Sequence, residues 1–348
     1  MIPELIIFMR KRAEEVENND RNTIDFKNGY YLAKELLEKG YTVVGLDQWQ
    51  YKGYSKGIVE HMENKNFTLI EGDITDRYLI RKLLTEHKPK FFINAAAISH
   101  VAISFKIPER TTQVNYVAVL NMLQEILAIS PGTKFLQCST SEQFGDNKEL
   151  PQNENSAMLP NSPYAIAKMA AFRLTKLYRN YGLKTYNTIA FNHESSHRPE
   201  NFVTRKITKH LTNIKKNKTS IPLELGNLDA YRDWGYAPDY TGAMIKMLES
   251  NVCEDYVLAT GETHTVREFI EETCNVLGWD IKWTGKGLEE QGFVDNKLVV
   301  KINPDFYRPA EVDKLCGDAS KIKAMLGWEP NTTFKELVNR MVKHDLKK

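Results

Sequence analysis

The chain has 348 residues, enough for about two domains or for one large fold with an added lobe, and its 42% hydrophobic and 26% charged residues exclude a fibrous or disordered protein. The 47 Lys and Arg nearly balance the 45 Asp and Glu, so the net charge of +2 gives no electrostatic reason to expect nucleic acid or an anionic membrane as a partner. Four widely spaced cysteines without a CxxC pair argue against a disulfide framework or a zinc site, and favour a reducing, cytoplasmic setting.

The first 28 residues differ from the rest of the chain. The apolar run of residues 5–9 is too short to cross a membrane, and the charged stretch that follows it is unlike a secretory signal. Two interpretations stay open. Residues 5–8 form the first strand, displaced by a charged insertion of about twenty residues, or residues 1–28 are not the ancestral start, as after a wrong start site or a frameshift.

From Gly29 onward, apolar runs of strand length alternate with segments of helical period, which is typical of stacked βαβ units and a parallel sheet. The predicted strands are residues 42–47, 67–74, 91–97, 134–140, 186–191 and 256–260. The predicted helices between them are residues 30–38, 76–86, 111–129 and 164–181, the last of them capped by Gly182. This order predicts an α/β fold with a doubly wound, Rossmann-type parallel sheet.

After Asn192 the alternation gives way to longer irregular pieces, with helices predicted at residues 203–216, 239–249, 266–277 and 334–343. Such a tail commonly closes over the carboxyl ends of the strands and supplies substrate contacts. We expect a smaller, interleaved C-terminal substrate-binding lobe. The predicted division is 1–190 for the dinucleotide-binding domain, with 228–262 returning to it, and 191–227 and 263–348 for the lobe.

One pair of side chains suggests catalysis. Tyr164 and Lys168 are four residues apart at the start of a predicted helix, so they share one face, and a nearby ammonium favours the phenolate form of a tyrosine. Alone this spacing is common, and a half-buried Tyr beside a solvated Lys is the ordinary interpretation. A buried strand that ends in Thr140-Ser141-Glu142, about two dozen residues upstream, makes coincidence less plausible.

With these motifs the sequence resembles the extended short-chain dehydrogenase/reductases, and among them the GDP-mannose 4,6-dehydratases, from about Gly29 to the C-terminus. Further matching blocks are residues 94–101, 191–195, 202–206, 225–227, 232–235 and 307–312. Glucose-nucleotide dehydratases typically carry an aspartate where Ser141 stands, which favours the mannose-specific family.

The resemblance implies a hydro-lyase that converts GDP-mannose into GDP-4-dehydro-6-deoxy-mannose and water by internal hydride transfer. Tyr164, assisted by Lys168, takes the proton of the sugar C4 hydroxyl, and Thr140 bonds the same oxygen. Glu142 removes the C5 proton and protonates the departing C6 hydroxyl.

The resemblance also implies the binding residues. For the dinucleotide they are Gly29, Asp47, Asp73, Ile74, Ala95, Ala96, Ala97, Ser99, Tyr164, Lys168, His193 and Arg198. For the GDP-sugar they are Asn192, Val203, Lys206, Arg232, Arg308 and Glu311, and no metal is implied. Taken singly, several have ordinary interpretations; Arg232 and Asp233, for example, form a surface ion pair in that view.

The glycine-rich loop expected before the first helix is incomplete. Only Gly29 falls on the motif, while Thr23 and Phe26 stand where two other glycines belong. A side chain at a position that needs close backbone approach to phosphate should clash or push the loop away. The sequence therefore predicts weakened cofactor affinity.

Residues 47–50 also depart from the family, which usually has arginines there that hold the 2′-phosphate of NADP and help to build a tetramer contact. An acid such as Asp47 suits the free ribose hydroxyl of NAD. NADP is the expected cofactor, with NAD the alternative, and the expected assembly is a homodimer or homotetramer.

Two rival functions stay open at this point. One is a catalytically silent nucleotide-sugar-binding protein that cannot hold a dinucleotide, which only residues 1–28 favour. The other is a dehydratase that acts on another nucleotide sugar, such as a glucose nucleotide.

Overall fold

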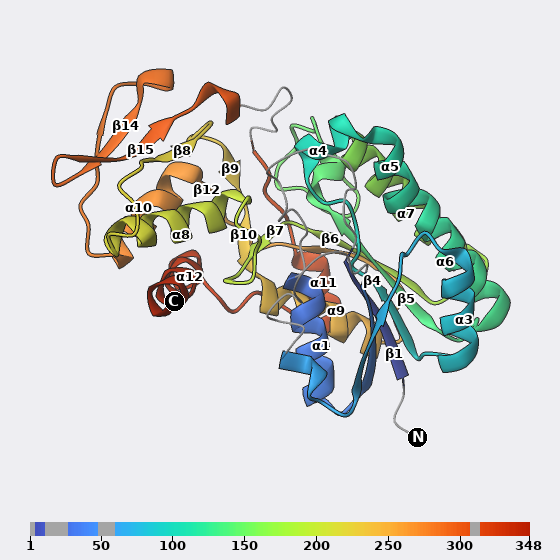
Figure 1. Cartoon of the computed structure of the whole chain (residues 1–348). Coiled ribbons are helices and arrows are strands. Elements are labelled where there is room, and N and C mark those ends of the chain that lie inside the picture. Colours follow the sequence, from blue (N-terminus) through green and yellow to red (C-terminus); the bar gives the residue numbers. More distant parts are fainter. Residues whose placement is uncertain (1–3, 11–26, 48–59, 307–313) are drawn as a thin grey trace.

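The computed structural model describes residues 4–10, 27–47, 60–306 and 314–348. Its central sheet has seven parallel strands in the order β11-β6-β5-β4-β1-β2-β3 (Figure 1). These strands are β1 (Glu4–Arg10), β2 (Thr42–Asp47), β3 (Phe67–Glu71), β4 (Phe91–Asn94), β5 (Lys134–Thr140), β6 (Thr185–Ala190) and β11 (Asp255–Leu258). The order runs outward from β1 in both directions, so the sheet is doubly wound with its switch point between β1 and β4. The predicted Rossmann-type α/β fold is confirmed.

Helices cover both faces of this sheet (Figure 1). On one face lie α1 (Lys27–Glu38), α9 (Ala237–Glu249) and α11 (Ser320–Leu326), and on the other α3 (Arg77–His87), α6 (Ala118–Ile129) and α7 (Pro163–Asn180). The short helices α4 (Val101–Lys106), α5 (Pro108–Thr112) and the π-helical turn η1 (Gln113–Val117) lead into α6. All seven residues of β5 are buried, as expected for a central strand covered on both faces.

The lobe contains a four-stranded sheet in the order β13-β14-β15-β8, with three helices packed against it (Figure 1). Its elements are α8 (Val203–Lys215), β8 (Leu223–Leu225), α10 (Val266–Val276), β13 (Lys282–Thr284), β14 (Gln291–Val294), β15 (Lys297–Ile302) and α12 (Phe334–Lys347). Short ladders lie between sheet and lobe: β7 (Asn192–Glu194) with β10 (Trp234–Tyr236), and β9 (Tyr231–Arg232) with β12 (His264–Thr265). The 3-10 turns are η2 (Ser141–Phe144), η3 (Gly287–Glu289) and η4 (Pro304–Phe306). A separate apolar core, which includes Phe269 and Leu337, holds the lobe together.

Three predicted strands are too long, and in two of them a polar side chain turns the chain where the strand ends. The strand predicted at 67–74 ends at Glu71, shortly before Asp73, which accepts hydrogen bonds from Thr75. The strand predicted at 91–97 ends at Asn94, whose Oδ1 accepts from the Ala96 N–H at 3.3 Å. The strand predicted at 256–260 spans Asp255–Leu258.

The remaining differences concern helices and the lobe. The helix predicted at 111–129 is divided into α5, η1 and α6, with Pro108 at the start of α5. The sequence did not predict α4, α11 or the strands of the lobe. The other predicted helices and strands agree with the structure to within a few residues. In the described part of the chain, no helix combines the length and the apolar character that membrane crossing requires.

At the N-terminus the structure contains the strand predicted at residues 5–8. Residues 4–10 form β1, which pairs in parallel with β2 (Leu5 opposite Val43) and with β4 (Leu5 opposite Phe91). The neighbouring strands therefore have their partner within the sheet. Thr23 and Phe26 lie outside the described residues.

Candidate active site

A cavity of about 720 Å³ lies at the carboxyl ends of β4, β5 and β6, between the central sheet and the lobe. The four residues predicted to be catalytic all line it: Thr140, Glu142, Tyr164 and Lys168. Open α/β sheets bind ligands at this edge, outside the carboxyl ends of their strands.

The end of β5 places the first two of these side chains. Thr140 closes the strand and caps the 3-10 turn η2, since its Oγ1 accepts a hydrogen bond from the Glu142 N–H at 3.3 Å. This cap sets Glu142 in the first turn of η2, beside the strand end. A hydroxyl and a carboxylate therefore enter the cavity two residues apart.

The start of α7 places the other two. Ser162 caps the helix by accepting from the Ala165 N–H at 3.1 Å, and Pro163 occupies its first position. The Tyr164 N–H donates to Ser104 Oγ at 3.1 Å, which ties the first turn of α7 to α4. Tyr164 and Lys168 are both buried, one turn apart on the same helix.

Lys168 is held in a dry environment. Its ammonium donates to the carbonyl oxygen of Cys138 in β5, and burial lowers the pKa of Lys168 to about 8. Burial also raises the pKa of the neighbouring Cys138 thiol to about 11. The lysine, and not the thiol, is therefore the group of this pair that changes charge just above neutral pH.

The residues predicted to bind a dinucleotide fall into two sets. Ala95, Ala97, Ser99, His193 and Arg198 line the cavity, together with Tyr164 and Lys168. Gly29, Asp47, Asp73, Ile74 and Ala96 do not line it. The structure thus brings the first set of predicted cofactor contacts together with the catalytic candidates, and leaves the second set outside the cavity.

Each residue of the second set has a definite place. Gly29 is buried in the first turn of α1, and Asp47 is buried as the last residue of β2. Asp73 forms an ion pair with Arg110 at 3.2 Å. The side chains of Ile74 and Ala96 pack in the apolar core between the sheet and α3 and α6.

Asn115, a residue that the sequence analysis missed, supports the loop that carries Ala97 and Ser99. The Ile98 N–H donates to Asn115 Oδ1 at 2.8 Å, and Asn115 Nδ2 donates to the Ile98 carbonyl at 3.0 Å. Asn115 lies in η1, so the π-helical turn and the loop are linked. An asparagine inside a mainly apolar helical segment was the available signal.

Asn28, also missed, lines the cavity at the start of α1. Its Oδ1 lies 3.0 Å from His193 Nε2, while His193 Nδ1 lies 2.7 Å from the Phe191 carbonyl oxygen. The His193 ring also stacks on Tyr240, with centroids 4.7 Å apart. These three contacts fix the orientation of the imidazole. The position of Asn28 directly before Gly29 was the signal in the sequence.

Four of the six residues predicted to bind the GDP-sugar line the cavity: Asn192, Val203, Lys206 and Arg232. Lys206 is half-buried; its ammonium donates to the Glu224 carbonyl at 2.7 Å and lies 3.8 Å from the centroid of the Phe306 ring. Burial lowers the pKa of Lys206. Arg308 and Glu311 lie outside the described residues.

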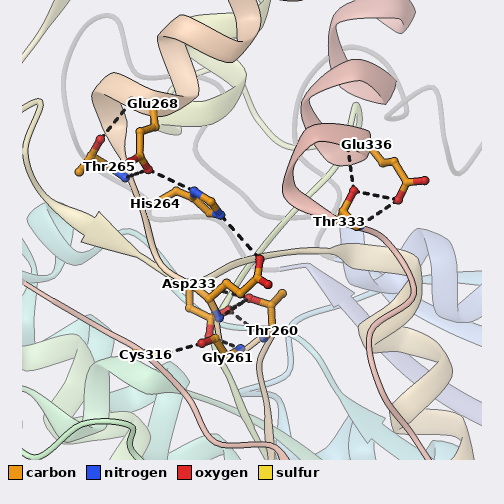
Figure 2. A network of polar contacts seen from close by, with 10 residues as sticks. Asp233, Thr260, Gly261, His264, Thr265, Glu268, Cys316, Thr333 and Glu336 are labelled. Atoms are coloured by element: carbon orange, nitrogen blue, oxygen red, sulfur yellow. Dashed lines mark hydrogen bonds and ion pairs between the residues drawn. The ribbon is translucent and has the colours of Figure 1, made fainter.

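The ordinary interpretation of Arg232 and Asp233 as a surface ion pair is wrong, because both residues are buried. Asp233 Oδ1 accepts from Thr260 N and Oγ1 at 2.9 and 2.7 Å, and its Oδ2 accepts from Gly261 N at 3.0 Å (Figure 2). The same Oδ2 accepts from Gly317 N at 3.2 Å. Burial raises the pKa of Asp233, although these donors act in the opposite direction. Asp233 therefore ties the chain after β11 to residue 317, directly beside Arg232 in the cavity wall.

In the described ranges, no group of three or more His, Cys, Asp or Glu side chains is arranged to hold a metal ion. The described residues that line the cavity offer hydroxyl, carboxylate, ammonium and guanidinium groups.

Comparison with known proteins identifies the family. The model of the family described as GDP-mannose 4,6 dehydratase matches residues 27–341. The GDP-mannose 4,6-dehydratase of Vibrio cholerae is 42% identical over 342 residues, covering 92% of this chain and 91% of the relative. The human GDP-mannose 4,6 dehydratase is 41% identical over 332 residues, covering 92% of this chain and 89% of the relative.

Solved structures show the same fold at lower sequence identity. The UDP-glucose 4-epimerase of Thermotoga maritima, solved with UDP-glucose, has a TM-score of 0.80 at 22% identity and covers 99% of both chains. A dTDP-glucose 4,6-dehydratase of Streptomyces venezuelae, solved with NAD bound, has a TM-score of 0.78 at 22% identity and covers 98% of this chain and 96% of its own. RMD from Pseudomonas aeruginosa, complexed with NADPH, has a TM-score of 0.72 at 20% identity and covers 99% of this chain and 100% of its own.

Proposed function

Because the chain belongs to the GDP-mannose 4,6-dehydratase family, we propose that it converts GDP-α-D-mannose into GDP-4-dehydro-6-deoxy-α-D-mannose and water. The observation that carries this proposal is the convergence of Thr140, Glu142, Tyr164 and Lys168 on one cavity between the sheet and the lobe. The reaction has no net redox change and belongs to the hydro-lyases.

The cavity fits a nicotinamide dinucleotide at its sheet side. Ala95 and Ala97 present small side chains there, and the buried Ser99 Oγ makes no hydrogen bond to any residue in the described ranges. Such a hydroxyl is available to a ligand. A nicotinamide bound there would supply reversible hydride transfer, by which C4 of the sugar is oxidised and C6 is later reduced.

The catalytic side chains divide the proton transfers between them. The Lys168 ammonium favours the phenolate form of Tyr164, and this phenolate takes the proton of the C4 hydroxyl and becomes a phenol. Thr140 bonds the same C4 oxygen. Once C4 is a ketone, the C5 hydrogen is acidic; Glu142 removes it and passes the proton to the C6 hydroxyl, which leaves as water. The C5=C6 double bond formed in this way gains hydride at C6 and a proton at C5, which balances the proton that Tyr164 took from the C4 hydroxyl. The burial of Tyr164 and Lys168 keeps bulk water away from this sequence.

Substrate binding involves the lobe. Asn192, Val203, Lys206 and Arg232 contact the GDP-sugar in this proposal. For Arg308 and Glu311 the proposal rests on the sequence resemblance alone. An arginine suits the diphosphate because its fork donates bidentately and keeps its charge. We propose NADP as the cofactor, with NAD as the alternative that Asp47 at the end of β2 favours.

The proposed assembly is a homodimer or homotetramer. Helix α7 supports this proposal, since Ile166 and Leu177 on it are 52% and 45% exposed. Light scattering of the purified chain measures the assembly directly, and a monomer at micromolar concentration contradicts it.

The deciding experiment incubates the purified protein with GDP-mannose, with and without added NADP+ or NAD+, and follows the 4-keto product by mass spectrometry. Formation of a product one water lighter than GDP-mannose supports the proposal. Binding of GDP-mannose without turnover under all conditions supports the silent binding protein instead. Turnover of UDP-glucose or dTDP-glucose in place of GDP-mannose supports a dehydratase for another nucleotide sugar.

A further inference from the structure

A further carboxylate, Glu194, lies in the cavity wall and has no part in the reaction described above. It ends β7, the strand that also carries Asn192 and His193, and it is 2% exposed. Because β7 pairs with β10, with Glu194 opposite Tyr236, its backbone is fixed. A carboxylate this buried needs partners that repay its desolvation.

Two partners from different segments meet Glu194. Its Oε2 forms an ion pair with Arg198 Nε at 3.2 Å, and the same oxygen accepts a hydrogen bond from Thr204 Oγ1 at 2.7 Å. Arg198 lies in the loop after β7, whereas Thr204 is the second residue of α8. Glu194 therefore links the loop to the first turn of the helix.

The other side of the Arg198 guanidinium is also occupied. Its central carbon lies 3.7 Å from the centroid of the Phe202 ring, and the Arg198 side chain is 10% exposed. The guanidinium is thus clamped between an aromatic face and a carboxylate while it lines the cavity. A long, flexible side chain held in this way loses little further entropy when it binds an anion.

Glu194 also connects two groups of predicted contacts. Arg198 belongs to the dinucleotide set, and Val203 and Lys206, which flank Thr204 on α8, belong to the GDP-sugar set. We propose that Glu194 is a positioning residue, which holds the Arg198 guanidinium and the first turn of α8 in the arrangement that binds both nucleotides. This inference rests on the proposed function for the identity of the two ligands.

The variant Glu194→Gln removes the charge and keeps the size. Its matched control is Glu125→Gln: Glu125 is 1% exposed and pairs with Arg77 and Arg81 between α3 and α6, away from the cavity. Calorimetric titration with NADP+ and with GDP gives two Kd values for each protein, and thermal unfolding gives the Tm. We expect Glu194→Gln to raise both Kd values about tenfold, whereas Glu125→Gln lowers the Tm and leaves both Kd values within about twofold of wild type.

A double-mutant cycle tests whether Glu194 acts through Arg198. In an Arg198→Ala background, Glu194→Gln should change the Kd for NADP+ by less than about twofold, because the group it positions is gone. If Glu194→Gln does not fold, Thr204→Val removes one donor to the same carboxylate, with an expected increase of about threefold in the Kd for GDP.

The proposal is overturned if Glu194→Gln lowers the Tm as the control does but leaves both Kd values within twofold of wild type, or if its effect is undiminished in the Arg198→Ala background. With Thr204→Val as the folded variant, an unchanged Kd for GDP overturns it. Wild-type turnover of GDP-mannose is measured separately. Its absence contradicts the proposed function and leaves the Kd comparison intact as the test of Glu194.

Discussion

The carboxyl end of β5 and the start of the chain contrast in how their sequence relates to their structure. At β5, buried apolar residues lead directly into Thr140 and Glu142, and α7 brings Tyr164 and Lys168 to the same cavity. At the start, β1 lies within the sheet with parallel pairing on both sides, yet only Gly29 remains of the glycine motif.

This difference separates two requirements of a dinucleotide fold. Strand pairing needs a short apolar run and a backbone ladder, which many sequences supply. Close approach of the backbone to a phosphate needs the absence of side chains at particular positions, which only glycine supplies. The chain satisfies the first requirement at β1, while its sequence departs from the second.

The largest expected effect is at the catalytic end. We expect Tyr164→Phe to lower kcat by a factor of about 10²–10⁴, because it removes the group that takes the C4 proton. Product formation from GDP-mannose is the measurement, with calorimetric GDP binding close to wild type. Tyr178→Phe is the matched control, since Tyr178 lies on the same helix, is equally buried at 8% exposure and is not part of the cavity wall.

If Tyr164→Phe retains more than a tenth of wild-type kcat, Tyr164 is not the acid/base. The catalytic role assigned to the residues after β5 is then contradicted, and the contrast with the start of the chain is lost.

The next effect concerns the wall of the same cavity. Asp233→Asn places an amide NH₂ against backbone N–H donors that now meet a carboxylate oxygen. We expect a loss of about 3 kcal/mol in the free energy of unfolding, measured by urea denaturation. Asp318→Asn is the control, because Asp318 accepts one exposed hydrogen bond, from the Ser320 N–H, and should cost under about 1 kcal/mol. Equal losses in the two variants contradict the anchoring role of Asp233.

Much of the sheet was predictable because buried parallel strands carry continuous apolar runs. The bounds of β5 agree with the predicted 134–140, and the helix at 164–181 differs from α7 by one residue at each end. Motif spacing also identified the four catalytic candidates, since all of them lie on β5, η2 and α7, which follow one another along the chain.

Contacts between distant segments were not predictable in the same way. Asn28 and His193 are 165 residues apart in the chain, and Asp233 meets Gly317 across 84 residues. Such pairs depend on how the lobe packs against the sheet, which periodicity does not encode. Most strands of the lobe were missed because two- to four-residue elements leave too little pattern. The six-residue strand β15 was missed as well.

The pH dependence of turnover tests the lysine at the catalytic end. Burial lowers the pKa of Lys168 to about 8, so its ammonium is lost as the pH rises through this value. We expect kcat/KM to fall about fiftyfold between pH 8 and pH 10, because the phenolate of Tyr164 loses its neighbouring charge. Cys138 does not account for this limb, since its pKa is raised to about 11.

Lys168→Arg provides the comparison for this profile. A guanidinium stays charged over the whole range, so the variant should have a lower plateau without the alkaline limb. An alkaline limb near pH 8 that persists in Lys168→Arg assigns the titration to another group.

The smallest effect is expected at the start of the chain, where we predict a gain in cofactor affinity. Phe26 stands where the family has a glycine, and its side chain should oppose the approach of the pyrophosphate. We expect Phe26→Gly to tighten the binding of NADP+ or NAD+ about fivefold, and Thr23→Gly added to it to tighten binding further. Calorimetric titration measures the Kd, with Tyr181→Gly as a control for a glycine substitution at an exposed aromatic residue that does not line the cavity. Micromolar binding by wild type, unchanged in Phe26→Gly, means that the chain binds the pyrophosphate without the missing glycines, and the contrast between the two regions then disappears.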